Sequence, residues 1–110
     1  MAFASNDLLN QGRTLLEIGE SHFDGEALQR ARAIFDQLAH PGTPSPSISY
    51  YQARVSLALV NVHAWRKETG AAVRYLDDAI ESAKAAIQRN PKHSDSHRLL
   101  GEAYGRLIGL

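Results

Sequence analysis

The chain has 110 residues, enough for one domain with a single modest core but not for two independent domains. Twelve basic residues balance twelve acidic ones, so no net charge would concentrate nucleic acid or hold an anionic membrane surface. The absence of cysteine excludes disulfides, thiolate metal sites and cysteine nucleophiles. The longest apolar run, residues 57–60, is far shorter than the roughly 20 residues that cross a bilayer. We therefore expect one soluble domain over residues 1–110, with no nucleic-acid partner and no membrane insertion.

The N-terminal residues Ala2-Phe3-Ala4 have the small-x-small form that precedes a signal-peptidase site, which would indicate export. Alanine-rich, disordered N-termini are also common, and such a start would contain no targeting signal. We favour a cytoplasmic location and keep export as the alternative.

Apolar residues recur at helical spacing along almost the whole chain, whereas no segment keeps the period of two that marks a strand. The pattern predicts an all-α fold. A first helix is expected over residues 5–20, and a second after Asp24, whose side chain can cap it, fading near Ala39. Residues 40–47 contain three prolines and a glycine, so we expect a loop there, with Ser45 or Ser47 capping the next helix.

The C-terminal half predicts three more helices. The third is expected over residues 48–68, with an apolar stripe that ends at Trp65. Gly70 should interrupt the helix and Thr69 cap the next one, which Asn90-Pro91 should stop. The fourth helix is expected to bury Val73, Leu76, Ile80, Ala83 and Ile87, with Ala72, Ala79 and Ala86 on the adjoining face. Ser94 should cap a fifth helix whose buried side is Leu99, Leu100, Ala103, Tyr104, Leu107 and Ile108.

Self-comparison reveals a repeated arrangement of small and large residues. Near the C-terminus these are Ala79, Ala83, Ala86 and Pro91, followed by His97, Leu100, Gly101 and Tyr104. This arrangement resembles the 34-residue tetratricopeptide repeat (TPR), from which only His97 and Ala83 depart in kind. A looser match near the N-terminus consists of Leu15, Ile18, Gly19, His22, Ala31, Phe35 and Leu38. The middle repeat has long helices, and its first-helix positions cannot be placed.

The resemblance implies a TPR-like array of antiparallel α-hairpins with about five helices, and an ordinary antiparallel bundle is the alternative. It also implies a non-catalytic module that binds a protein or peptide in a concave groove lined by the first helices of the repeats. The implied groove residues are Arg13, Leu16, Glu20, Phe23 and Asp24 in the first repeat, and Asp95, Arg98, Glu102, Gly105 and Arg106 in the last. Because the Lys and Asn of the family's chaperone-tail binders are absent from these positions, such an adaptor is disfavoured.

The last repeat lacks the second helix that the family pattern supplies, and its first helix carries Leu107 and Ile108. Three explanations stand: a longer repeat protein, a helix that folds its apolar face fully inward as a cap, or pairing with another chain. We favour the first and third, because repeat arrays usually finish with a polar outer face. Leu107 and Ile108 are therefore added to the candidate partner-binding residues. A structural subunit or homo-oligomer that assembles through residues 94–110 is the first alternative function.

A small helical enzyme or metal-binding domain is the second alternative. His93 and His97 have the i, i+4 spacing that can point two imidazoles to one side of a helix. No glutamate stands between them as in metalloproteases, and His97 fills an aromatic position of the repeat. No nucleophile motif or phosphate-binding glycine loop is present. We expect no catalytic residues, no cofactor and no metal.

Overall fold

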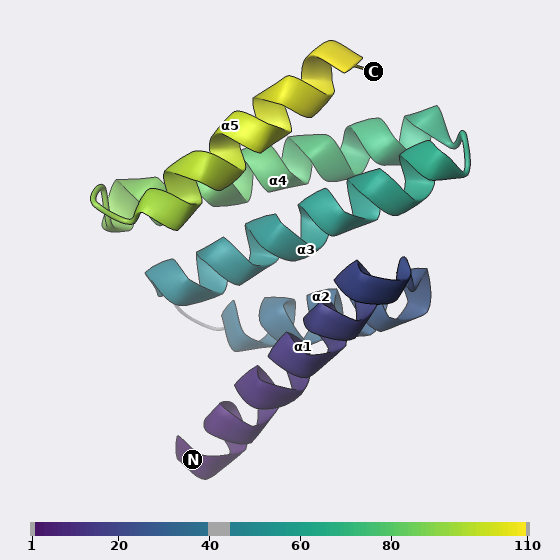
Figure 1. Ribbon diagram of the computed structural model, residues 1–110. Helices are drawn as coiled ribbons and strands as arrows, with labels where there is room; N and C mark the ends of the chain where they lie inside the picture. Colours follow the sequence, from purple (N-terminus) through teal and green to yellow (C-terminus); the bar gives the residue numbers. More distant parts are fainter. Residues whose placement is uncertain (1, 40–44, 110) are drawn as a thin grey trace.

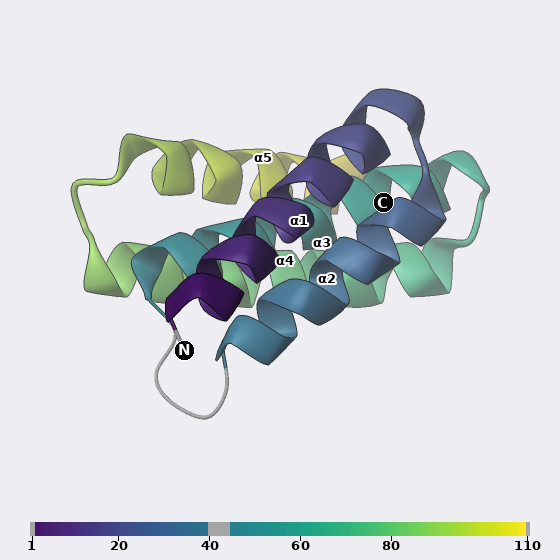
Figure 2. The same ribbon diagram turned by 90° about the horizontal axis from the view of Figure 1, so that it is seen from below.

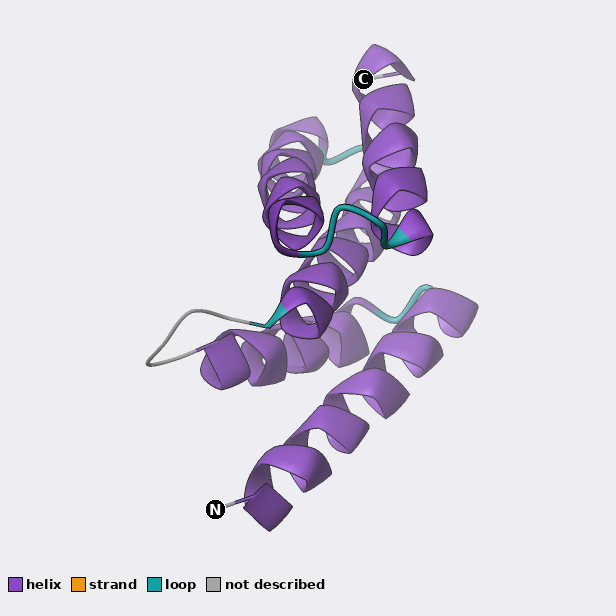
Figure 3. Cartoon of the chain, turned by 90° about the vertical axis from the view of Figure 1, so that its left-hand side faces the viewer, coloured by secondary structure: helices purple, strands orange, loops and turns teal. Residues whose placement is uncertain are grey.

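The computed structural model describes residues 2–39 and 45–109, and within these residues every regular element is a helix (Figure 1, Figure 3). The helices are α1 (Ala2–His22), α2 (Gly25–Ala39), α3 (Pro46–Trp65), α4 (Thr69–Arg89) and α5 (Ser94–Gly109). The prediction of an all-α fold with five helices is confirmed. None of the described helices combines the length and the apolar character that crossing a bilayer requires.

Each helix packs against the next along the chain, and α3 occupies the centre of the bundle. In Figure 3, α1 and α5 lie on one side of α3, while α2 and α4 lie on the other. Figure 2, seen from below, shows α5 and α4 on opposite sides of the bundle and α1 crossing in front of α3. Both α1 and α5 contact α3, but within the described residues no Cα atom of α1 comes within 8 Å of one in α5. α1, α3 and α5 therefore border a common space, which stays open because α1 and α5 do not pack against each other.

Two predicted helix starts are confirmed by side-chain hydrogen bonds. Asp24 Oδ1 accepts the backbone N–H groups of Glu26 and Ala27, at 3.1 and 3.2 Å, where α2 begins. Ser45 Oγ accepts the N–H of Ile48 at 3.2 Å, and Pro46 occupies the first turn of α3, where its missing N–H has no partner to lose. Residues 40–44 of the predicted loop lie outside the described residues.

The break between α3 and α4 was predicted at the wrong residues. α3 ends at Trp65 rather than at Glu68, and α4 begins with Thr69 as its first residue, so Thr69 is not the cap and Gly70 does not interrupt the helix. The chain reverses at residues 66–68, where Lys67 adopts a φ of 62°. The sequence signal was missed because a lysine in the left-handed region is uncommon.

Two other boundaries differ from the prediction. Ser94 is the first residue of α5 rather than its cap, and the turn before it is closed by the Ser96 N–H, which donates to the His93 carbonyl at 3.1 Å. α1 begins at Ala2 rather than Ser5, so residues 2–4 belong to the first helix.

The core consists of two apolar clusters that share α3. The first joins α1, α2 and α3 and comprises Leu16, Leu28, Ala31, Phe35, Val55, Ala58, Leu59 and Val62. The second joins α3, α4 and α5 and comprises Ala53, Leu57, Val60, Ala72, Leu76, Ala79, Ala83, Leu99 and Ala103. Because α3 contributes to both clusters, it presents apolar residues on two different faces, as expected of a central helix.

The predicted buried faces of the last two helices need correction. In α4, the predicted Leu76 and Ala83 are buried, Ile80 and Ile87 are only partly buried, and Val73 is 37% exposed. Ala72, Ala79 and Ala86 are buried with Leu76, because these small residues let α3 and α4 approach closely. In α5, the buried residues are Ser96, Leu99 and Ala103, whereas Tyr104, Leu107 and Ile108 are 41%, 49% and 90% exposed. α5 therefore does not fold its apolar face fully inward as a cap, and three of its six residues predicted to be buried are exposed.

Two glycines that the repeat pattern treats as equivalent have different surroundings. A Cβ on Gly19 would lie 2.4 Å from both Cγ and Cδ2 of Leu28, so α2 packs directly against the α1 backbone at this point. A Cβ on Gly101 of α5 would meet nothing within 4 Å. The close contact that a second helix makes on α1 thus has no counterpart on α5.

Candidate functional site

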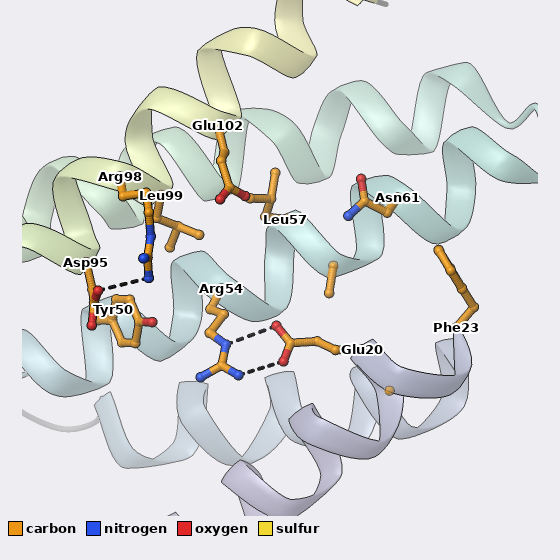
Figure 4. Close-up of a pocket in the computed structure, with 12 residues that line it drawn as sticks. Glu20, Phe23, Tyr50, Arg54, Leu57, Asn61, Asp95, Arg98, Leu99 and Glu102 are labelled. Carbon is orange, nitrogen blue, oxygen red and sulfur yellow. Dashed lines mark hydrogen bonds and ion pairs between the residues drawn. The ribbon is translucent and has the colours of Figure 1, made fainter.

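A trough runs along α3, with α1 as one wall and α5 as the other (Figure 4). Its first part is a hollow of about 440 Å³, lined by Gly19, Glu20, Phe23, Tyr50, Arg54, Leu57, Ala58, Asn61, Asp95, Arg98, Leu99 and Glu102. A second hollow of about 500 Å³ is lined by Phe23, Val60, Asn61, Ala64, Trp65, Gly105, Arg106 and Gly109. Because Phe23 and Asn61 belong to both linings, the two hollows are successive parts of one trough.

The floor of the trough is one face of α3. Tyr50, Arg54, Leu57 and Asn61 follow one another at steps of four, three and four residues, so they project to the same side of the helix. Trp65, predicted as the last residue of the apolar stripe of this helix, lies at the end of the floor and is 79% exposed. From Tyr50 to Trp65 the floor is about 22 Å long at 1.5 Å per residue.

Phe23 enters the trough from the end of α1. It follows the last helical residue, His22, and has a φ of 51°, a left-handed conformation that ends the helix. A phenylalanine there is uncommon, because such positions favour glycine and asparagine. The side chain is 56% exposed, so burial does not account for an aromatic residue at this position.

Two ion pairs stand in the polar part of the trough. The Arg54 guanidinium donates from Nε and Nη2 to the Glu20 carboxylate, at 2.9 and 2.7 Å, and so joins α3 to α1. The hydrogen bond to Glu20 raises the pKa of Arg54, and partial burial opposes this effect. On α5, Arg98 Nη2 donates to Asp95 Oδ1 at 2.9 Å.

Glu102 is the remaining charged side chain of the polar part. It extends from α5 toward Leu57 on the floor (Figure 4). Among the residues that the structure describes, none lies within salt-bridge distance of its carboxylate. The trough therefore offers one acidic group that the neighbouring arginines leave uncompensated.

Of the predicted groove residues, five come together in the first hollow although they are widely separated in sequence: Glu20, Phe23, Asp95, Arg98 and Glu102. Two more, Gly105 and Arg106, line the second hollow.

The other predicted site residues lie elsewhere. Leu16 is fully buried in the core, so it is not part of the groove surface, and Asp24 is engaged in capping α2. The Arg13 guanidinium lies over the Tyr51 ring, 5.7 Å from its centroid. Leu107 and Ile108 are exposed on α5 and do not line the trough.

The floor residues of α3 were missed in the sequence. The reason is the middle repeat, whose first-helix positions could not be assigned, so no α3 residue was proposed for the groove. A partial signal was present: Arg54 and Asn61 are polar and seven residues apart, although α3 also carries other polar residues, such as Gln52, Ser56 and His63. Seven residues are two helical turns, which places both on one face.

The two histidines weighed as metal ligands each have another contact. His93 Nδ1 lies 2.6 Å from Ser96 Oγ, and His97 Nε2 lies 2.6 Å from the Pro91 carbonyl oxygen. His93 precedes α5, so the pair does not share a helical face as i, i+4 residues. Within residues 2–39 and 45–109 no group of three or more metal-ligating side chains is present.

Comparisons of the chain with protein-family models, with curated proteins and with solved structures found no match. The resemblance to the tetratricopeptide repeat therefore depends on the residues of this chain alone.

Proposed function

We propose that this chain is a TPR-like, non-catalytic binding module that holds a peptide segment of another protein in the trough between α1, α3 and α5. The observation that carries the proposal is the convergence of Glu20 and Phe23 with Asp95, Arg98 and Glu102. The repeat pattern alone predicted these residues as groove-lining, and they line one hollow.

The chemistry of the trough supports binding. Its first hollow has a size typical of ligand sites, and it combines charged groups with an exposed aromatic residue, Phe23. Glu20 of the α1 wall pairs with Arg54 of the floor, and Asp95 pairs with Arg98 within the α5 wall. Carboxylates held in ion pairs favour a positioning role over proton transfer. Exposed aromatic residues, here Phe23 and Trp65, are enriched among residues that dominate protein interfaces.

The test is selection of binders from a library of random twelve-residue peptides, followed by calorimetric titration of the selected peptides. Ala64 is exposed at the floor of the second hollow, so Ala64→Arg should obstruct the trough and weaken binding at least about tenfold without unfolding the protein. Ala33, exposed on α2, provides the matched control, because Ala33→Arg introduces the same side chain outside the trough and should leave affinity unchanged. Equal effects of the two substitutions would contradict a binding site in the trough.

A second candidate function is self-assembly through α5. The observation in its favour is the exposure of Tyr104, Leu107 and Ile108, together with the open space beside Gly101. The measurement is molar mass by light scattering over a dilution series. A concentration-dependent dimer that Ile108→Lys abolishes would support this function, and a strict monomer would contradict it.

A further inference from the structure

The trough has a chemical direction along α3. At the Tyr50 end its lining carries Glu20, Arg54, Asp95, Arg98 and Glu102, and at the other end it carries Val60, Ala64 and Trp65, while Phe23 lines both parts. A ligand that fills both hollows must therefore be polar at one end and apolar at the other.

The polar end has a net negative charge. Its lining holds three carboxylates and two guanidiniums, and both guanidiniums are paired with carboxylates of the same lining, Arg54 with Glu20 and Arg98 with Asp95. Glu102 is left as the group without a partner among the described residues, and it extends over the trough floor beside Leu57 (Figure 4). A cationic side chain of a ligand is the complement to this carboxylate.

The apolar end presents exposed aromatic surface on two sides. Phe23 and Trp65 are 56% and 79% exposed, and Val60 and Ala64 line the same hollow. Arg106 also lines this end, one helical turn beyond Glu102 on α5. A large apolar side chain fits this hollow, whereas a second cation there would meet the charge of Arg106.

The distance between the two ends sets the spacing in the ligand. Leu57, beneath Glu102, and Trp65 are eight residues apart in α3, which is about 12 Å along the helix axis. An extended chain advances about 3.3 Å per residue, so about three to four residues span this distance. Asn61 lies between the two ends and belongs to both linings. Its carboxamide can donate to and accept from one peptide unit, which an extended segment leaves free.

We infer that the trough recognises an extended peptide segment in which a Lys or Arg side chain pairs with Glu102 and a large apolar side chain, three or four residues away, packs on Phe23 and Trp65. The inference depends on the proposed function, because it specifies the ligand of the same trough.

The experiment uses eight-residue, fluorescein-labelled peptides with blocked C-termini and a serine-alanine background, titrated with the protein and followed by anisotropy. The test peptide carries Arg and Leu three residues apart. Three comparison peptides replace Arg by Glu, replace Leu by Ser, or place Arg and Leu next to each other. The inference predicts that the test peptide binds tighter than each comparison peptide, and tightest at a spacing of three or four residues.

Two protein variants assign the subsites. Glu102→Gln should weaken the test peptide about two- to fivefold and leave a peptide with Gln in place of Arg unaffected. Its control is Glu81→Gln on α4, an exposed carboxylate outside the trough. Trp65→Ala should weaken binding about three- to tenfold, and Val73→Ala, on the exposed side of α4, should not. Because Glu102, Trp65 and their controls are exposed, these changes should leave folding intact, which circular dichroism can verify.

The outcomes separate the two levels of the proposal. If peptides bind but charge reversal or Glu102→Gln leaves their affinity unchanged, this inference is overturned and the trough remains a peptide site. If a helical peptide with the same residues seven positions apart binds better than the extended one, the inference is also overturned. If none of these peptides binds and the random library yields no peptide that binds in the titration, both this inference and the proposed function fail.

Discussion

Matched alanine substitutions at Gly19 and Gly101 should change stability in opposite directions. Both glycines lie inside helices, and replacing a helical glycine by alanine removes a conformational penalty of about 1 kcal/mol. At Gly101 the new methyl group meets nothing within 4 Å, so the full gain should appear. We expect Gly101→Ala to raise the free energy of unfolding by about 0.5–1 kcal/mol.

At Gly19 the same methyl group would lie 2.4 Å from two carbon atoms of Leu28, more than 1 Å inside normal contact distance. The Leu28 side chain is fully buried, so it cannot swing into solvent, and either its rotamer or the spacing of α1 and α2 must change. Such overpacking costs about 1–3 kcal/mol. A cost in the middle of this range, about 2 kcal/mol, exceeds the gain of about 1 kcal/mol from replacing a helical glycine. We expect Gly19→Ala to lower the free energy of unfolding by about 1–2 kcal/mol.

The assay is urea denaturation followed by circular dichroism, with thermal unfolding as a second probe. The two variants should differ by about 1.5–3 kcal/mol, or roughly 10 °C in Tm. As a control, Leu28→Ala should be less damaging in the Gly19→Ala background than alone, because the overlap disappears with the leucine side chain. Equal stabilisation by the two glycine substitutions would refute the close packing of α2 on α1. Destabilisation by Gly101→Ala that depends on protein concentration would refute the open surface on α5.

Three further predictions concern helix ends, the ion pair and the α5 surface. Ser45→Ala should cost about 1 kcal/mol in urea denaturation, since it removes the α3 cap, and Ser45→Asp should restore most of the loss. Glu20→Gln should cost about 0.5–1 kcal/mol, because both members of its ion pair are about one-third exposed. The pKa of Arg54 is raised, so its charge is fully present in both states from about pH 6 to 9, and the loss should shrink with salt rather than vary with pH. If Glu20→Gln lowered the free energy of unfolding by the same amount in about 1 M salt, the prediction would be contradicted. Replacing Leu107 and Ile108 by Lys should leave a folded protein by circular dichroism, because Ile108 is 90% exposed, whereas unfolding would indicate an inward cap.

Local sequence signals predicted the helices well wherever a side chain makes a local hydrogen bond or a proline blocks one. Asp24 and Ser45 cap as expected, and Asn90-Pro91 ends α4. The failures arise at residues 66–68 and 93–94, where backbone geometry, and not a capping side chain, determines the boundary. Such turns leave no residue-type signature.

Burial was harder to predict than helicity, since periodicity identifies an apolar stripe but not the partner that covers it. Val73 and Ala72 are neighbours on α4, yet the smaller one is buried because α3 approaches the alanine side. Trp65 continues the apolar stripe of α3 and projects beyond its packed part. The trough walls could be predicted through the repeat pattern. Its floor could not, because the long middle hairpin shifts the register.

The most direct test of peptide binding in the trough is a nitrogen-15 NMR titration of the protein with the Arg- and Leu-containing peptide. The chain has a single tryptophan, Trp65, so its indole N–H gives one resolved reporter at the apolar end of the trough. Binding in the trough should cause saturable shifts at the Trp65 indole and at the Asn61 side-chain amide, accompanied by shifts of Phe23 and Glu102. Shifts confined to Tyr104, Leu107 and Ile108, with the trough signals unmoved, would place the binding surface on α5 and contradict the account.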